Sequence, residues 1–178
     1  YQNMKIEKIQ IKDGLFDAIY FGHVKNGKPN GKGYIKNGEL DKFNKISWVN
    51  KSIIKKGIFK NGYLVKGKIR ESFCKIFEGT LKNKEINAKG KIKYVYDNGK
   101  AYQEYVGEVR KNRFGYVPHG NGKLTTFLNG NISMGKFTNG LLKKGKMYWG
   151  SKKKWEAFPN KNIIKYHRGN INKRLKKL

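Results

Sequence analysis

Residues 20–33 read Tyr-Phe-Gly-His-Val-Lys-Asn-Gly-Lys-Pro-Asn-Gly-Lys-Gly, and this stretch decides the fold. Tyr20 and Val24 lie on one side of an alternating pattern, which is typical of a β-strand with one buried face. The Asn-Gly pair at 26–27 is preferred in two-residue turns, because both positions of such a turn take a positive φ. The stretch therefore predicts a β-hairpin.

The hairpin pattern recurs along the chain. Its first half is anchored on a glycine, and the anchors are Gly22, Gly57, Gly79, Gly107 and Gly135, at spacings of 35, 22, 28 and 28 residues. Its second half recurs as Gly67-Lys-Ile, Gly90-Lys-Ile, Gly122-Lys-Leu and Gly145-Lys-Met, with Gly33-Tyr-Ile as the variant. A degenerate sixth copy runs from about Trp155 to Asn160. The unequal spacings indicate insertions around 43–55 and at 113–119.

Asn-Gly pairs also recur, at 26–27, 37–38, 61–62, 98–99, 129–130 and 139–140. One such pair is compatible with an ordinary loop, but six of them flanking regular apolar positions favour a chain of hairpins. The fold class expected is all-β: an elongated, twisted antiparallel sheet of successive β-hairpins.

The pattern Tyr-x-Gly-x-apolar-x-Asn-Gly-x-x-x-Gly-x-Gly at 20–33 resembles the MORN repeat (membrane occupation and recognition nexus). Residues 77–90 and 105–122 match it in part, and residues 55–67 and 133–145 lack the leading aromatic. The resemblance covers about residues 20–160. It implies an elongated sheet of hairpins, and a function among scaffolds, lipid-associated proteins or appendages of enzymes. The domain division expected is an N-terminal cap segment or strand at 1–19, the repeat sheet at 20–160 and a basic helix or tail at 161–178.

Alternation places one set of apolar residues on a common face. This predicted stripe consists of Val24, Phe59, Leu81, Val109, Phe137, Ile35, Ile69, Ile92, Leu124 and Met147, joined by Tyr20, Phe77 and Tyr105. We interpret it as the repeat core, with a ligand-binding aromatic groove as the alternative.

The opposite face is expected to carry rows of cations. First strands place Lys25, Lys60, Lys82 and Arg110 there, and second strands add Lys68, Lys91, Lys123, Lys146, Arg70 and Lys93. The run Lys152, Lys153 and Lys154 precedes Trp155, an aromatic that could stack on a base or belong to the core. Like charges across a sheet cost stability, so their repetition favours a binding role over a merely solvated face.

The C-terminal stretch adds Arg168, Lys173, Arg174, Lys176 and Lys177. Ile171, Leu175 and Leu178 share one face of a short helix, which could cap the open end of the sheet. The alternative is a basic tail that becomes ordered on an anionic partner.

The 178 residues include 41 Lys and Arg against 12 Asp and Glu, a formal net charge of +29. An AT-rich genome would favour lysine, but it does not explain the scarcity of acids. The basic excess indicates a polyanionic partner. Cys74 is the single cysteine, so an intramolecular disulfide is excluded and a reducing compartment is favoured. We expect an intracellular, cytoplasmic location; the chain begins at Tyr1, which leaves open a preceding targeting segment.

Signals for catalysis are weak. His23, His119 and His167 have no metal-ligand spacing, and the acids are dispersed. We expect no enzyme, cofactor or metal. The leading hypothesis is a binding protein for nucleic acid, RNA above all, in or against a ribonucleoprotein complex. The alternatives are a MORN-type scaffold on anionic membrane lipids and an adaptor whose apolar stripe binds a protein partner.

Overall fold

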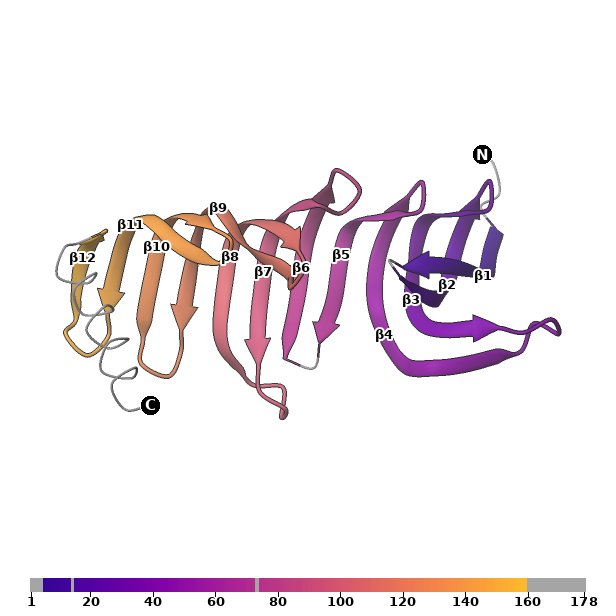
Figure 1. The fold of residues 1–178 in the computed structure, drawn as a ribbon, viewed down its shortest axis with the longest axis horizontal. Coiled ribbons are helices and arrows are strands. Elements are labelled where there is room, and N and C mark those ends of the chain that lie inside the picture. The colour runs from indigo at the N-terminus through magenta and orange to yellow at the C-terminus, as the bar shows by residue number, and fades with distance from the viewer. Residues whose placement is uncertain (1–4, 14, 73, 160–178) are drawn as a thin grey trace, which may run out of the picture.

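The computed structural model describes residues 5–13, 15–72 and 74–159. They form one antiparallel sheet in which every strand pairs with its neighbours in sequence (Figure 1). Its strands are β1 (Lys5–Asp13), β2 (Phe16–Lys25), β3 (Lys28–Leu40), β4 (Ile46–Lys60), β5 (Tyr63–Ser72), β6 (Lys75–Lys82), β7 (Asn87–Val95), β8 (Ala101–Asn112), β9 (Gly115–Thr126), β10 (Asn131–Thr138), β11 (Leu141–Trp149) and β12 (Lys154–Phe158). The expected all-β sheet of successive hairpins is confirmed. The expected C-terminal helix lies outside the described residues.

The anchor glycines align across the sheet. Gly22 pairs with Gly33, Gly33 with Gly57, and the pairing continues without interruption to Gly145, so ten glycines form one row from β2 to β11. We call this the glycine row. It fixes the register of all these strands, because each hairpin contributes one glycine from each strand.

Close approach explains why the row is glycine. The Tyr20 hydroxyl donates to the carbonyl oxygens of His23 at 3.0 Å and Lys32 at 3.2 Å, which brings its ring over the row. A Cβ on Gly33 would overlap this ring, and a Cβ on Gly57 would overlap the neighbouring backbone. The space that side chains would occupy is therefore already filled.

The buried face is the one predicted. Of the thirteen stripe residues, twelve lie in the hydrophobic core or pack against it. Aromatic rings of neighbouring units also pack against each other. Tyr20 meets Phe59 with ring centroids 5.0 Å apart, and Tyr105 meets Phe137 at 5.1 Å. Met147 is the exception: it is half-buried and outside the core. Its directly opposite cross-strand neighbours are Ser133 and Glu156, which are both polar, whereas most other stripe residues face apolar neighbours.

Three Asn-Gly pairs form the predicted two-residue turns. At 26–27, 61–62 and 139–140 both residues have a positive φ, as the tight turns require. The pairs at 98–99 and 129–130 lie in longer turns. The prediction for Asn37-Gly38 is wrong, because this pair lies inside β3, whose hairpin with β4 is lengthened by the insertion.

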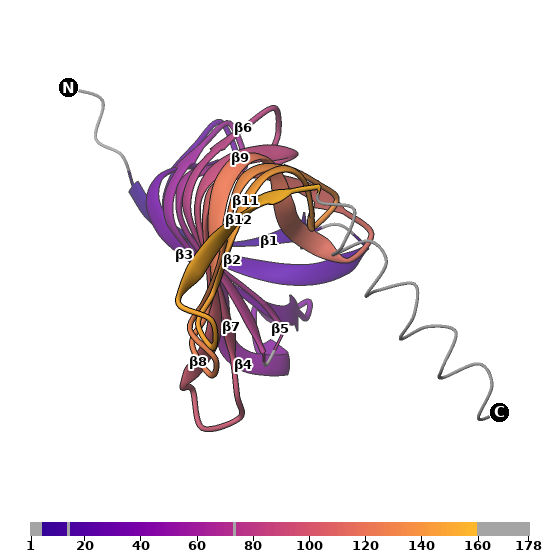
Figure 2. The ribbon, with the colours of Figure 1, turned by 90° about the vertical axis from the view of Figure 1, so that its left-hand side faces the viewer.

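The second insertion lengthens the β8–β9 hairpin, which the structure extends as strands rather than as an irregular loop, so His119 lies in β9. The tip of this hairpin folds over the inner face (Figures 1 and 2). Tyr116 stacks on Phe77 with centroids 4.8 Å apart, and its hydroxyl donates to the carbonyl of Glu85 at 2.6 Å. The tip of the β8–β9 hairpin and the β6–β7 turn thereby cover the inner face near β6.

A buried ion cluster joins distant parts of the sheet at this point. Lys55, on β4, occupies the inner position that Tyr20 and Phe77 fill in other units, next to Ile35 and Ile69. Its Nζ lies 2.7 Å from Asp13 Oδ1 and 2.6 Å from Glu85 Oε2. Burial lowers the pKa of Lys55, but the two carboxylates outweigh burial and raise it overall. At this position two ion pairs of Lys55 thus take the place of the aromatic ring found in other units.

Candidate nucleic-acid interface

The outer side of the glycine row is bordered by lysines. On each strand the residues before and after the glycine point away from the core, because neighbouring side chains in a strand alternate. Ten lysines occupy these positions, and we call them the double lysine row: Lys56, Lys68, Lys91, Lys123 and Lys146 on one side of the glycines, and Lys32, Lys66, Lys89, Lys136 and Lys144 on the other.

The register sets the spacing within this double row. Strands are about 4.8 Å apart, and residues flanking one glycine are about 7 Å apart along a strand. The double row runs from β3 to β11, a distance of about 40 Å. Cations therefore recur at intervals of roughly 5–10 Å in the line from Lys56 to Lys146 and of roughly 5–14 Å in the line from Lys32 to Lys144, the widest gap being between Lys89 and Lys136.

Few carboxylates neutralise these lysines. Nine of the ten are exposed, and among the described residues only Lys91 has a carboxylate partner, with its Nζ 3.3 Å from Glu104 Oε1. Glu78 and Glu108 are the acids at equivalent outer positions, and Glu108 Oε2 accepts a hydrogen bond from the Asn121 backbone N–H at 2.6 Å. The ammonium groups of the other nine lysines therefore have no carboxylate within ion-pair distance among the described residues.

Several acidic residues lie instead on the inner side of the sheet or in its turns, and they pair with cations there. Glu71 accepts the Tyr116 backbone N–H at 2.7 Å and pairs with Lys75 Nζ at 2.9 Å. Asp13 and Glu85 bind Lys55. These carboxylates neutralise buried or half-buried cations, so they leave the positive potential of the outer face in place.

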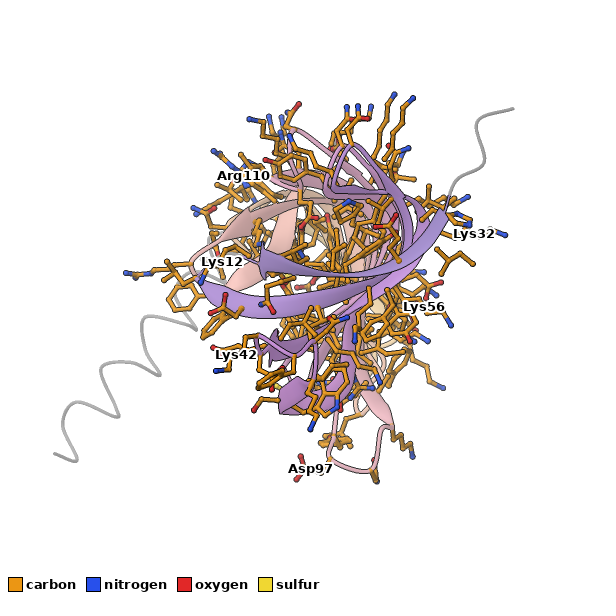
Figure 3. The ribbon with its side chains drawn as sticks, turned by 90° about the vertical axis from the view of Figure 1, so that its right-hand side faces the viewer. Lys12, Lys32, Lys42, Lys56, Asp97 and Arg110 are labelled. Carbon is orange, nitrogen blue, oxygen red and sulfur yellow. The ribbon has the colours of Figure 1, made fainter. Side chains whose placement is uncertain are left out.

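The predicted site residues fall into several groups. Lys68, Lys91, Lys123 and Lys146 belong to the double lysine row. The first-strand cations are exposed near the hairpin ends, at Lys25, Lys60, Lys82 and Arg110. Because the sheet curves, Arg110 faces a different direction from the double lysine row: Figure 3 shows Lys32 and Lys56 on one side and Arg110 directed away from them. Arg70 and Lys93 are exposed on β5 and β7.

Of the predicted site residues near the C-terminus, some lie within the described part of the chain and some lie outside it. Lys152, Lys153 and Lys154 are exposed at the turn between β11 and β12, where Lys152 Nζ lies 3.9 Å from Glu156 Oε1. The interpretation of Trp155 as a core residue is wrong: its side chain is 41% exposed. Arg168, Lys173, Arg174, Lys176 and Lys177 lie outside the described residues.

Sequence reasoning missed six members of the double row: Lys32, Lys56, Lys66, Lys89, Lys136 and Lys144. A signal for them was present, because Lys-Gly-Lys occurs at 66–68, 89–91 and 144–146. Only the lysine after each glycine was assigned to the outer face. Both neighbours of an inward glycine must point outward, so the triplet itself indicates two rows.

Aromatic rings lie beside the double row at both ends. Near β3, Phe21 stacks on Tyr34 with centroids 5.0 Å apart, and Lys36 Nζ lies 5.8 Å from the Tyr34 ring centroid. These two rings and Ile58 border a groove of about 630 Å³ that crosses the glycine row. Near β12, Trp155 lies 5.3 Å from Tyr148, with Lys146 Nζ 4.7 Å from its centroid. Both ends combine rings with cations.

In the described ranges, no group of three His, Cys, Asp or Glu residues is close enough to hold a metal ion. His119 Nδ1 accepts the Asn139 backbone N–H at 3.4 Å. Within the same ranges, no helix has the length and apolar character needed to cross a bilayer.

Comparison of the chain with protein-family models and with curated proteins finds no match.

Proposed function

We propose that this protein is a non-enzymatic binding protein that holds the phosphodiester backbone of nucleic acid, RNA in a ribonucleoprotein complex above all, along the double lysine row. The observation that carries the proposal is the row itself: ten lysines in two lines, of which one is paired with a carboxylate. When lysines neutralise phosphates, the counterions condensed along the nucleic acid are released, and this release drives binding. The location proposed for this role is intracellular and cytoplasmic.

The chemistry of the row favours contact with phosphates over reading of sequence. Lysine is a compact point charge on a flexible chain, whereas base recognition relies on groups with directional, paired hydrogen bonds. The aromatic rings at either end, such as Tyr34 and Trp155, would add stacking that tolerates any base. We therefore expect affinity that depends strongly on salt and weakly on sequence.

The repeated units support a related proposal, that they are divergent MORN repeats. The support comes from the pattern at 20–33 and its recurrence at regular positions of the sheet, with the glycines aligned. A MORN-type scaffold on anionic lipids would use the same cations, so the experiment must compare both partners.

The test compares two variants with equal loss of charge. One replaces Lys68, Lys123 and Lys136 by Gln within the double row; the control replaces Lys42, Lys45 and Lys100 by Gln, three exposed lysines in turns away from it. Binding of a fluorescent 20-nucleotide RNA is measured at 150 mM salt, beside flotation with phosphatidylserine vesicles.

We expect the row variant to bind RNA at least about tenfold more weakly and the control to bind like the wild type. Equal weakening in both variants would mean that net charge alone attracts RNA, and the double row would be discarded as a site. Binding to anionic vesicles without binding to RNA would replace the proposal with the membrane scaffold.

A further inference from the structure

A second surface lies on the opposite side of the sheet, between two hairpin tips. The tips of β1–β2 and β8–β9 border a cleft of about 560 Å³, with β4 and β5 at its base. Leu15 and Phe16 stand at one tip and Phe114 at the other, and these residues are 94%, 70% and 68% exposed. Three large apolar residues thus meet water around one depression.

Cations surround the same depression. Arg70, Lys111 and Arg113 line it and are exposed, and Arg113 lies over the Phe114 ring at 4.7 Å from its centroid. The acids that line it, Asp13 and Glu71, are already paired with Lys55 and Lys75. The charge left over at the rim is therefore positive.

The tips are held in place by contacts of their own. Lys75 Nζ donates to the carbonyl of Phe114 at 2.7 Å and to that of Tyr116 at 3.1 Å, and Asn112 Oδ1 accepts the Phe114 backbone N–H at 2.8 Å. The ion pair from Asp13 to Lys55 fixes the end of β1. Exposed apolar residues on a fixed frame are typical of an interaction site.

From this arrangement we propose that the cleft binds a short acidic segment of a partner protein, one that carries apolar side chains between its carboxylates. The apolar side chains would lie against Leu15, Phe16 and Phe114, and the carboxylates would meet Arg70, Lys111 and Arg113. A small ligand inside the cleft would leave Leu15 in water, whereas a peptide crossing from tip to tip covers both sides. A second copy of the chain is disfavoured, because each copy carries a formal net charge of +29.

The test selects from a library of random 12-residue peptides on the full chain at 150 mM salt. The peptides recovered are then measured by fluorescence anisotropy against the wild type and three variants. Leu15→Ser/Phe114→Ser removes the apolar rim and Arg113→Gln removes a rim cation. Lys68→Gln/Lys123→Gln removes cations from the double lysine row and is the control. All these side chains are exposed, so the fold should be retained.

The expected result is recovery of peptides that contain both acidic and apolar residues. Their affinity should fall at least about tenfold in the rim variants and stay unchanged in the control. Recovery of no peptide, or of peptides indifferent to the rim variants, would overturn the proposal. So would loss of RNA binding in Arg113→Gln together with displacement of the peptide by RNA, because the cleft would then belong to the nucleic-acid site.

Discussion

The Tyr105 ring lies directly over Gly122, so closely that a Cβ on this glycine would overlap the tyrosine hydroxyl. The hydroxyl donates to the carbonyl of Glu108 at 2.8 Å, which repeats the contact that Tyr20 makes with His23 in the first unit. This contact therefore explains the leading tyrosine together with the glycine opposite it, Gly33 in the first unit and Gly122 in the later one. Other glycines of the row, such as Gly57, are held instead by close backbone approach.

This relationship predicts the effect of Gly122→Ala. We expect the substitution to lower the free energy of unfolding by about 1–3 kcal/mol, because an added methyl group must displace a buried ring. Urea denaturation measures the change. In a Tyr105→Leu background the same substitution should cost clearly less, since the nearest atoms to the new methyl all belong to Tyr105. Equal costs in both backgrounds would refute the proposed overlap.

The buried ion cluster gives a second prediction. Lys55→Met should lower the free energy of unfolding by about 3–5 kcal/mol, because the buried Glu85 and the half-buried Asp13 would remain without their cation. Lys56→Met is the matched control: Lys56 follows directly in the chain but is exposed on the outer face. We expect the control to change stability by less than about 0.5 kcal/mol. Comparable losses in the two variants would show that the cluster contributes no specific stability.

Alkaline pH should unfold the protein through its buried tyrosines. Burial, assisted by Glu71 and Tyr102, raises the pKa of Tyr94 to about 12, and burial likewise raises the pKa of Tyr20, Tyr105 and Tyr116. A raised folded-state pKa means that the folded protein keeps its proton after the unfolded chain has lost it. The free energy of unfolding is then unaffected by these groups below pH 10 and falls above it, by at most about 1.4 kcal/mol per pH unit for each such tyrosine, until the pH passes the pKa of that tyrosine in the folded protein.

Lys55 contributes in the same direction, because its pKa is also raised and its ion pairs are lost as the pH passes that value. Urea denaturation at pH 8, 10 and 11 measures the fall, and phenolate absorbance follows the tyrosines. Titration of all eleven tyrosines at their ordinary pKa in a protein that stays folded would contradict the burial of Tyr20, Tyr105 and Tyr116.

Much of the fold could be predicted from the sequence because it rests on local signals. The anchor glycines and the alternation of Val24, Phe59 and Phe137 gave the strands and the buried face directly. The long β3–β4 hairpin was harder to predict from the sequence, because Asn37-Gly38 has the composition of a turn but lies within a strand. The inward packing of Tyr116 depends on a hairpin tip folding back, which no local pattern encodes.

The candidate site was predicted only in part for a different reason. Alternation alone assigns residues such as Lys68 and Lys123 to the outer face, but it does not show how strands align. The triplets indicate outward lysines on both sides of each glycine, but only the register shows that Lys66 and Lys136 fall in the same line and that Glu104 lies close to Lys91. Curvature then directed Arg110 away from Lys32 and Lys56, a separation that depends on the shape of the whole sheet (Figure 3).

The salt dependence of RNA affinity tests the binding role of the double lysine row most directly. For single-stranded RNA, the slope of log affinity against log salt concentration is about −0.7 for each phosphate neutralised. Replacing Lys68, Lys123 and Lys136 by Gln should make the slope less steep by about 2, whereas replacing Lys42, Lys45 and Lys100 should leave it unchanged. An affinity that is flat with salt in the wild type, or a slope that changes equally in both variants, would contradict the assignment.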